Sequence, residues 1–184
     1  MASITTKVGD KGNTRLWSGE EVRKTDERIE FCGLIDELVS QLGVGFASAE
    51  AEIDSIVLSE IENVQRELFV LASEVATQEP RRSELERKIG KEAVSELEVR
   101  MKRIEEVVNP AKGWILPGAS IVSAQLDVAR CMARRCERSY VSLLDNNLVD
   151  NEDGLIWLNR ISDYLYLLAR YQERNQYRVI KHHG

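Results

Sequence analysis

Arginines are concentrated in residues 117–138, a segment that begins Pro-Gly-Ala-Ser and continues as a helical pattern. Arg130, Arg134 and Arg138 recur at every fourth residue, a spacing that places them one turn apart on one side of a helix. The chain carries a net charge of −6, so its composition does not account for a local run of cations. Guanidinium groups bind phosphates or carboxylates through paired hydrogen bonds. This arginine ladder (Arg130, Arg134 and Arg138) indicates an anion site, although a solvated face with helical ion pairs fits the spacing equally well.

A second basic segment lies near the N-terminus. Residues 6–15 combine spaced glycines, hydroxyl side chains and cations, and Lys7, Arg15 and Lys24 could neutralise phosphate charge. Glycines let backbone amides turn toward an anion. The order of glycines, lysine and hydroxyl differs from that of a Walker loop, and no strand precedes it. An anion-binding arm and a simple β-turn at residues 10–13 both remain open.

Short polar side chains follow one side of the last helical segment. Asn159, Asp163, Tyr166 and Arg170 are separated by steps of four, three and four. If this strip faces the arginine ladder, its short side chains could orient guanidinium groups or a ribose; an ordinary solvent-facing strip is the alternative. Asp36, flanked by small residues, could pair with an arginine across an interface or could simply lie at the surface.

Apolar residues recur at alternating steps of three and four in five segments, the pattern of helices with one buried side. Aromatic content is only 6%, so a sheet is not expected. We expect an all-α protein, a five-helix antiparallel bundle with an irregular N-terminal nucleotide-binding arm. Residues 78–90 read as a flexible connection with a turn of helix. The five stripes are Phe31, Ile35, Leu38, Leu42 and Gly45; Val57, Ile61, Val64, Leu68, Leu71 and Val75; Val94, Leu97, Met101, Ile104 and Val108; Val122, Leu126, Ala129, Ala133, Cys136, Tyr140 and Leu143; and Leu158, Ile161, Leu165 and Leu168.

Length and composition describe one globular domain. A chain of 184 residues with 43% hydrophobic content can build one sizeable core, so we expect a single domain over residues 1–184. Its parts would be an arm over 1–24, a bundle over 25–176 and a tail over 177–184. An isoelectric point of 5.2 argues against nucleic acid as a partner. No apolar run approaches the roughly 20 residues that span a bilayer, so no membrane association is expected.

The sequence lacks the residue motifs that several classes of catalytic chemistry need. No Glu-x-x-His pair, Cys-x-x-Cys motif or nucleophile-elbow serine occurs, and His182 and His183 read as part of a mobile tail. The three cysteines, Cys32, Cys131 and Cys136, read as small buried hydrophobes in a reducing compartment. Without a secretory signal pattern, we expect a cytoplasmic protein. The remaining features favour chemistry carried out by the ligands, with the protein supplying position and electrostatics.

Four blocks of sequence together resemble the PduO-type ATP:corrinoid adenosyltransferases, the cobalamin adenosyltransferase family. The resemblance extends over nearly the whole chain, and the joint pattern is far more specific than any single block. The blocks are residues 6–14 with Lys24; Gly33-Leu34-Ile35-Asp36-Glu37-Leu38; Ile115-Leu116-Pro117-Gly118 continuing into 129–138; and residues 158–165 with 169–171.

The resemblance implies a homotrimer of five-helix bundles with active sites between neighbouring subunits. The substrates would be ATP, with Mg²⁺ carried on its phosphates and no metal ligand assigned to a protein side chain, and cob(I)alamin. The cobalt would attack the ribose C5′ of ATP, releasing triphosphate and giving adenosylcobalamin. An adenosylcobalamin-dependent acceptor enzyme and a flavoprotein reductant are the implied partners.

The resemblance also assigns individual site residues. Arg130 and Asp36 match a pair that bridges subunits and, with Arg134, are the expected catalytic residues. Trp114, at a position usually occupied by Phe, and Asp163 match the corrinoid pocket; Asp127 stands where His is frequent. The expected ATP-binding residues are Thr6, Lys7, Val8, Gly9, Thr14, Arg15, Lys24, Arg134, Glu137, Arg138 and Asn159.

Two other functions remain open. A non-catalytic carrier of nucleotide or corrinoid on the same scaffold would deliver cofactor to an acceptor enzyme. A plain helical assembly protein would use the arginines as surface or interface pairs, and ATP binding separates it from the other two.

Overall fold

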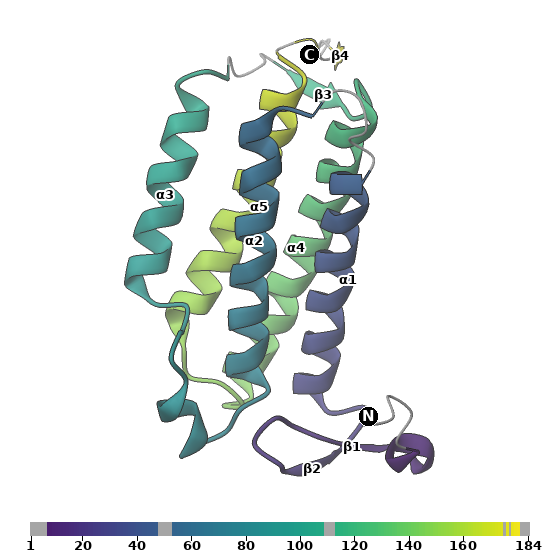
Figure 1. Cartoon of the computed structure of the whole chain (residues 1–184), viewed down its shortest axis with the longest axis vertical. Helices are drawn as coiled ribbons and strands as arrows, with labels where there is room; N and C mark the ends of the chain where they lie inside the picture. The colour runs from purple at the N-terminus through teal and green to yellow at the C-terminus, as the bar shows by residue number, and fades with distance from the viewer. Residues whose placement is uncertain (1–6, 48–52, 109–112, 175, 177, 181–184) are drawn as a thin grey trace.

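The computed structural model describes residues 7–47, 53–108, 113–174, 176 and 178–180. Within them, five α-helices run alternately up and down as one antiparallel bundle (Figure 1). Helix α4 packs against both α1 and α5, while α2 packs on α1 and α3 on α5. The predicted all-α, five-helix fold is confirmed. The helices are α1 (Glu27–Ala47), α2 (Ser55–Val75), α3 (Lys91–Glu105), α4 (Ile121–Asp145) and α5 (Glu152–Gln172).

The predicted apolar stripes form the core. All seven stripe positions of α4 are buried, and so are the stripes of α1, α2 and α5. In α3, Met101 is only partly buried and Val108 lies beyond the last helical turn. Complete burial of a side chain such as Leu stabilises a fold by about 1.5–3 kcal/mol, so the stripes hold the helices together.

Side-chain caps lie at the starts of α2, α4 and α5. Ser120 and Ser123 form a reciprocal capping box at the start of α4, with hydrogen bonds of 3.1 Å. The side chain of Asn151 accepts from the backbone N–H of Gly154 at the start of α5, and Asp54 caps α2 in the same way. Each cap satisfies a backbone donor that has no partner inside its own helix.

The N-terminal arm contains more regular structure than expected. A short 3-10 helix, η1 (Val8–Lys11), precedes an antiparallel hairpin of β1 (Asn13–Arg15) and β2 (Glu21–Arg23). The Arg28 side chain, 4% exposed, joins this arm to α1 because it donates to Asp26 at 2.7 Å and to Glu20 at 3.2 Å. The hydrogen bond from Arg28 lowers the pKa of Asp26. The arm therefore has a fixed attachment at the lower end of the bundle in Figure 1.

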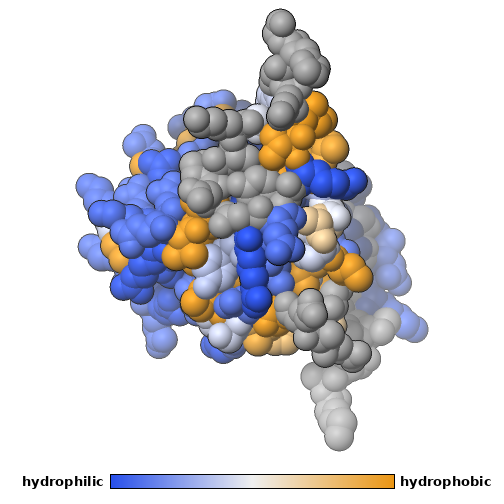
Figure 2. All heavy atoms as spheres, turned by 90° about the horizontal axis from the view of Figure 1, so that it is seen from above, coloured by the Kyte–Doolittle hydropathy of each residue, from blue (hydrophilic) through white to orange (hydrophobic). Residues whose placement is uncertain are grey.

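A second two-stranded sheet closes the opposite end. Strand β3 (Trp114–Leu116) pairs antiparallel with β4 (Arg178–Ile180), with Trp114 opposite Ile180. The expectation of no sheet is therefore wrong for these two strands, and the tail expected over 177–184 contains a strand at residues 178–180. His182 and His183, expected in a mobile tail, lie outside the described residues. Figure 2 looks onto this end and shows hydrophobic patches within a mostly hydrophilic surface. Exposed apolar side chains of the two strands are Trp114, Leu116, Val179 and Ile180.

The connection between α2 and α3 is attached to the bundle. It contains the expected helical turn, η2 (Arg81–Glu84), but is not a loosely held linker. Glu74 accepts hydrogen bonds from the backbone N–H of Ile89 and, at 2.8 Å, from Asn151 Nδ2. Asn151 also donates to the Ile89 carbonyl at 2.8 Å. These bonds join the α2–α3 connection to the α4–α5 turn.

The cysteines divide into different environments. Cys136 is buried and Cys32 half-buried, and burial raises the pKa of their thiols to about 12 and about 11. Cys131 is exposed, which corrects the expectation of three buried cysteines. Cys131 lies two residues from both Ala129 and Ala133, so it faces away from the α4 apolar stripe. Among the described residues, no helix is long and apolar enough to cross a membrane, and no group of three His, Cys, Asp or Glu could hold a metal ion.

Candidate functional site

The arginine ladder lies along α4 beside its buried stripe, with Arg134 and Arg138 on the outward side of the helix. Arg134 and Arg138 are exposed, and neither has a recorded hydrogen bond or ion pair within the described part of the chain. The adjacent Arg135 differs, because it pairs with Glu37 on α1. Two guanidinium groups one turn apart are thus available for an external anion.

Arg130, the third ladder residue, is held differently. Its side chain is 31% exposed, its Nε atom is buried, and that atom lies 3.5 Å from Oδ1 of Asp127. Asp127 also accepts a hydrogen bond from the buried Arg170 of α5. Arg130 therefore belongs both to the ladder and to a charged network inside the bundle.

Two predicted nucleotide residues from different helices are in contact. Asn159 Nδ2 on α5 donates to Glu137 Oε1 on α4 at 2.8 Å. The strip to which Asn159 belongs does not stay on one surface: Asp163 and Tyr166 are exposed, whereas Arg170 is only 2% exposed. Thus the α5 strip changes from surface to interior toward its C-terminal end.

The arm places Lys24 against its own glycine-containing loop. A Cβ atom built on Gly9 would lie 3.0 Å from both Cε and Nζ of Lys24, so a side chain at position 9 would displace the end of this lysine. The Lys24 backbone N–H donates to the Gly12 carbonyl at 2.9 Å, which fixes the chain there. Lys7 is exposed, with a left-handed backbone at φ 57.

The remaining arm residues lie in or before the hairpin. Thr14 is half-buried in β1, and Arg15 is exposed with its Nη2 atom 4.0 Å from Glu21. Val8 begins η1. Thr6 lies outside the described residues.

The arm reaches the bundle at the same end as the lower part of the ladder. Glu27, at the start of α1, accepts hydrogen bonds from Ser142 at 2.8 Å and from Asn146 at 2.9 Å. At 1.5 Å per residue, Arg138 and Arg134 lie roughly 6 and 12 Å along α4 from Ser142. Asp36 is exposed on α1 next to Glu37, and the Glu37–Arg135 pair places it at the level of Arg134. Trp114, 67% exposed, lies at the opposite end.

Residues 4–172 of this chain match the family model described as "Cobalamin adenosyltransferase". The chain belongs to the cobalamin adenosyltransferase family. A corrinoid adenosyltransferase of Citrobacter freundii is 37% identical over 174 residues, covering 94% of this chain and 96% of the relative. The chain spans 52% of the longer PduO corrinoid adenosyltransferase of Salmonella typhimurium, at 35% identity. Human corrinoid adenosyltransferase MMAB is 32% identical over 185 residues, covering 97% of this chain and 73% of the relative.

Solved structures show the same fold. A variant of the PduO-type ATP:corrinoid adenosyltransferase from Lactobacillus reuteri, in complex with cobalamin and ATP, superposes with a TM-score of 0.85 at 32% identity. The match covers 99% of this chain and 97% of that one. The resemblance stated from the four sequence blocks is therefore confirmed at the level of family and fold.

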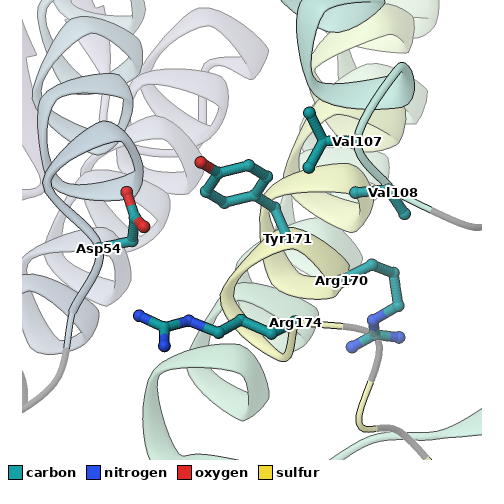
Figure 3. Close-up of a pocket in the computed structure, with 6 residues that line it drawn as sticks. All are labelled: Asp54, Val107, Val108, Arg170, Tyr171 and Arg174. Atoms are coloured by element: carbon teal, nitrogen blue, oxygen red, sulfur yellow. The ribbon is translucent and has the colours of Figure 1, made fainter.

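The described cavities of this cobalamin adenosyltransferase family member lie away from the ladder. One of about 200 Å³ lies between the ends of α2, α3 and α5; in Figure 3 the Tyr171 ring and the Arg174 guanidinium extend toward Asp54, whereas Arg170 extends to the other side. Another of about 490 Å³ lies between α2 and α3. Neither is lined by the ladder or the arm. The exposed site residues Asp36, Arg134 and Arg138 lie on α1 and α4, outside both of these cavities.

Sequence reasoning missed the partners that hold the family's site residues in place. Arg28 at the arm joint and the Asp127–Arg170 contact both depend on how segments pack together. The available signal was the helical spacing of Asp127 and Arg130, which is three residues. That spacing permits a contact but does not indicate that it is buried.

Proposed function

We propose that this chain transfers the 5′-deoxyadenosyl group of ATP to the cobalt of cob(I)alamin, giving adenosylcobalamin and triphosphate. Its membership in the cobalamin adenosyltransferase family supports this activity. The observation that carries the site assignment is that exposed Arg134 and Arg138 have no recorded partner within the described chain and approach the end where the arm presents Lys24. This arrangement of cations suits a triphosphate.

The reaction needs positioning and charge stabilisation more than a protein nucleophile. The electron pair of cobalt(I) forms the bond to C5′, and the C5′–O bond breaks with its electrons going to the leaving triphosphate. Negative charge therefore develops on that oxygen, where Arg134, Lys24 and Lys7 would stabilise it. Preorganised donors of this kind contribute about 3–4 kcal/mol each. Mg²⁺ would enter with ATP, bound to the phosphate oxygens.

The nucleotide would lie between the arm and the α4–α5 surface. The glycine-lined loop with Lys24 covers the phosphates, while the hydrogen-bonded Glu137 and Asn159 close the other side. The arm would contribute Thr6, Lys7, Val8, Gly9, Thr14, Arg15 and Lys24, and the helices Arg134, Glu137, Arg138 and Asn159.

The corrinoid would approach from the other end of the bundle, with Trp114 and Asp163 contacting it. Helix α4 has 25 residues and is therefore about 37 Å long, so Trp114 and Lys24 of one chain are widely separated. A homotrimer whose sites combine surfaces of two subunits would bring the two ligands together. Exposed Asp36 on α1 is available to meet Arg130 of a neighbouring copy.

The trimer has a direct test in sedimentation. Replacing Asp36→Ala should lower the trimer fraction or weaken corrinoid binding in a spectral titration. Glu30→Ala, another exposed acid of α1, serves as the control. An Asp36→Ala protein that sediments and titrates like the unmodified chain would reject the bridging role.

The activity itself is tested by mixing the protein with reduced cobalamin and MgATP and following the absorption spectrum. We expect cob(I)alamin to disappear and adenosylcobalamin and triphosphate to appear in equal amounts. Binding of both ligands without product would instead identify a carrier. No binding of ATP would leave only the helical assembly protein.

A further inference from the structure

Four charged side chains form a network between the upper turns of α4 and the end of α5. Asp127 Oδ2 accepts a hydrogen bond of 2.6 Å from Arg170 Nη2, while Asp127 Oδ1 lies 3.5 Å from Arg130 Nε. Glu173 Oε2 lies 2.8 Å from Arg170 Nε. Asp127, Arg170 and Glu173 are buried, with exposed fractions of 5%, 2% and 5%.

The charges balance, but the two arginines are not equally supported. Arg170 has two carboxylates within reach, Asp127 and Glu173. For Arg130, Asp127 is the carboxylate recorded within the described chain. A buried charge is tolerated when it keeps a partner. Loss of the Asp127 charge would leave Arg170 paired with Glu173, so its main effect would fall on Arg130.

Asp127 holds the inner edge of the Arg130 guanidinium. The Nε atom is buried beside Asp127, without a hydrogen bond, whereas Nη2 lies 3.5 Å from the sulfur of the exposed Cys131. One edge of the group thus faces the network and the other lies at the surface of α4. An ion pair at 3.5 Å restrains a flexible arginine in this orientation, because the attraction weakens as the group turns away.

We propose that Asp127 is a positioning residue that orients Arg130 for the corrinoid side of the reaction. The inference rests on the proposed function. Arg130 is one turn above Arg134 and two above Arg138, so it lies roughly 6 and 12 Å farther from the arm along α4. It is thus the ladder residue closest to the end that carries Trp114. Disturbing it should affect the corrinoid and leave ATP binding unchanged.

The test is Asp127→Asn, which keeps the shape and an acceptor for Arg170 but removes the charge. We expect KM for cob(I)alamin to rise roughly tenfold with KM for ATP unchanged, an effect within the range for contacting residues. Simple loss of folded protein would lower kcat and leave both KM values alone. Asp127→Glu, which retains the charge, should bring the corrinoid KM most of the way back to that of the unmodified protein. If the Asn variant does not fold, Asp127→Glu alone should show a smaller rise in corrinoid KM, and an unchanged value would overturn the proposal.

A double-mutant cycle with Arg130→Ala separates the proposal from a general structural role. If Asp127 acts through Arg130, adding Asp127→Asn to Arg130→Ala should change the corrinoid KM no further. The matched control is Glu67→Gln, which removes the charge facing Arg100 on the α2–α3 side, where the two groups lie 2.8 Å apart. Equal effects of Asp127→Asn with and without Arg130 would overturn the proposal. Absence of activity in the unmodified protein would instead reject the proposed function.

Discussion

Asn159 on α5 and Glu137 on α4 are joined by a hydrogen bond of 2.8 Å, although they are 22 residues apart in the sequence. Asn159 also accepts a hydrogen bond of 2.9 Å from Arg160 Nη1. The amide is therefore held from both of its ends, with its donor directed at the carboxylate. The contact fixes the Glu137 side chain one residue before Arg138, on the side of α4 assigned to the nucleotide.

Replacing Asn159→Asp should weaken ATP binding. The change removes the donor and places a second carboxylate within 3 Å of Glu137, so the two anions repel each other and the pair separates. We expect KM for ATP to rise about tenfold, and the free energy of unfolding to fall by about 1–3 kcal/mol. Initial rates at saturating corrinoid and thermal unfolding measure the two effects.

The control for this change is Asn63→Asp on α2. Asn63 is exposed and donates to Glu60 at 3.4 Å, so the same new charge arises far from the α1–α4 surface. It should leave KM for ATP unchanged. An Asn159→Asp protein with the ATP affinity of the unmodified chain would show that the Asn159–Glu137 contact serves only the fold.

Adjacent arginines on α4 allow a matched test of the ladder. Arg134→Ala removes a cation with no recorded partner in the described chain and should lower kcat by about 100-fold or more, with the oligomer intact. Arg135→Ala removes the exposed pair with Glu37, which is worth about 0–1 kcal/mol, and should keep most of the activity. Steady-state kinetics with sedimentation measures both variants. Full turnover in Arg134→Ala would refute the assignment of the ladder to the triphosphate.

The sequence was sufficient to predict the helices because their apolar stripes are long and regular. The α4 stripe from Val122 to Leu143 contains no exception, and the Ser-x-x-Ser box marks its start. The ladder could be assigned to a surface for the same reason: once the stripe is buried, Arg134 and Arg138 must face outward. Periodicity thus predicts both the residues of the core and those on the exposed side of the helix.

What could not be predicted depends on contacts between distant segments. Strands β3 and β4 have three residues each, too short for an alternating pattern, and they pair across more than 60 residues of chain. Arg170 lies in a polar strip, yet it is buried because Asp127 and Glu173 neutralise it. The site that we propose between subunits would likewise be a property of the assembly, which one chain's pattern does not contain.

Glu74 should make the stability of the bundle depend on pH. Burial raises the pKa of its carboxyl above the ordinary value of 4.5, although Ile89 and Asn151 donate hydrogen bonds to it. Because the folded-state pKa is the higher one, the stability from this group is fully present below about pH 4.5 and is lost as pH rises through the folded pKa. Thermal unfolding should therefore show the midpoint of the unmodified protein falling relative to that of Glu74→Gln as pH increases above about 4.5.

Glu86→Gln provides the reference for this measurement, because Glu86 lies in the same connection but is exposed. Its midpoint should follow that of the unmodified protein at every pH. The Gln variant of Glu74 loses an acceptor and starts from a lower midpoint, so the slope with pH is the decisive quantity. Parallel curves for Glu74→Gln and the unmodified protein would rule out the titration.

Removing strand β4 should change KM for the corrinoid and leave KM for ATP unchanged. Strand β4 supplies the partner strand of Trp114 in the described chain, and Arg178 Nη2 donates to the Pro117 carbonyl at 3.2 Å just beyond β3. Two-stranded sheets this short are marginal, so removing residues 178–184 should release β3 and reorient Trp114. We expect KM for cob(I)alamin to rise several-fold while KM for ATP stays constant, because the arm lies at the opposite end of the bundle.

A chain ending at Ile180 is the matched control for this truncation and should behave as the full chain. Equal corrinoid KM values for the two truncations would show that β4 does not position Trp114.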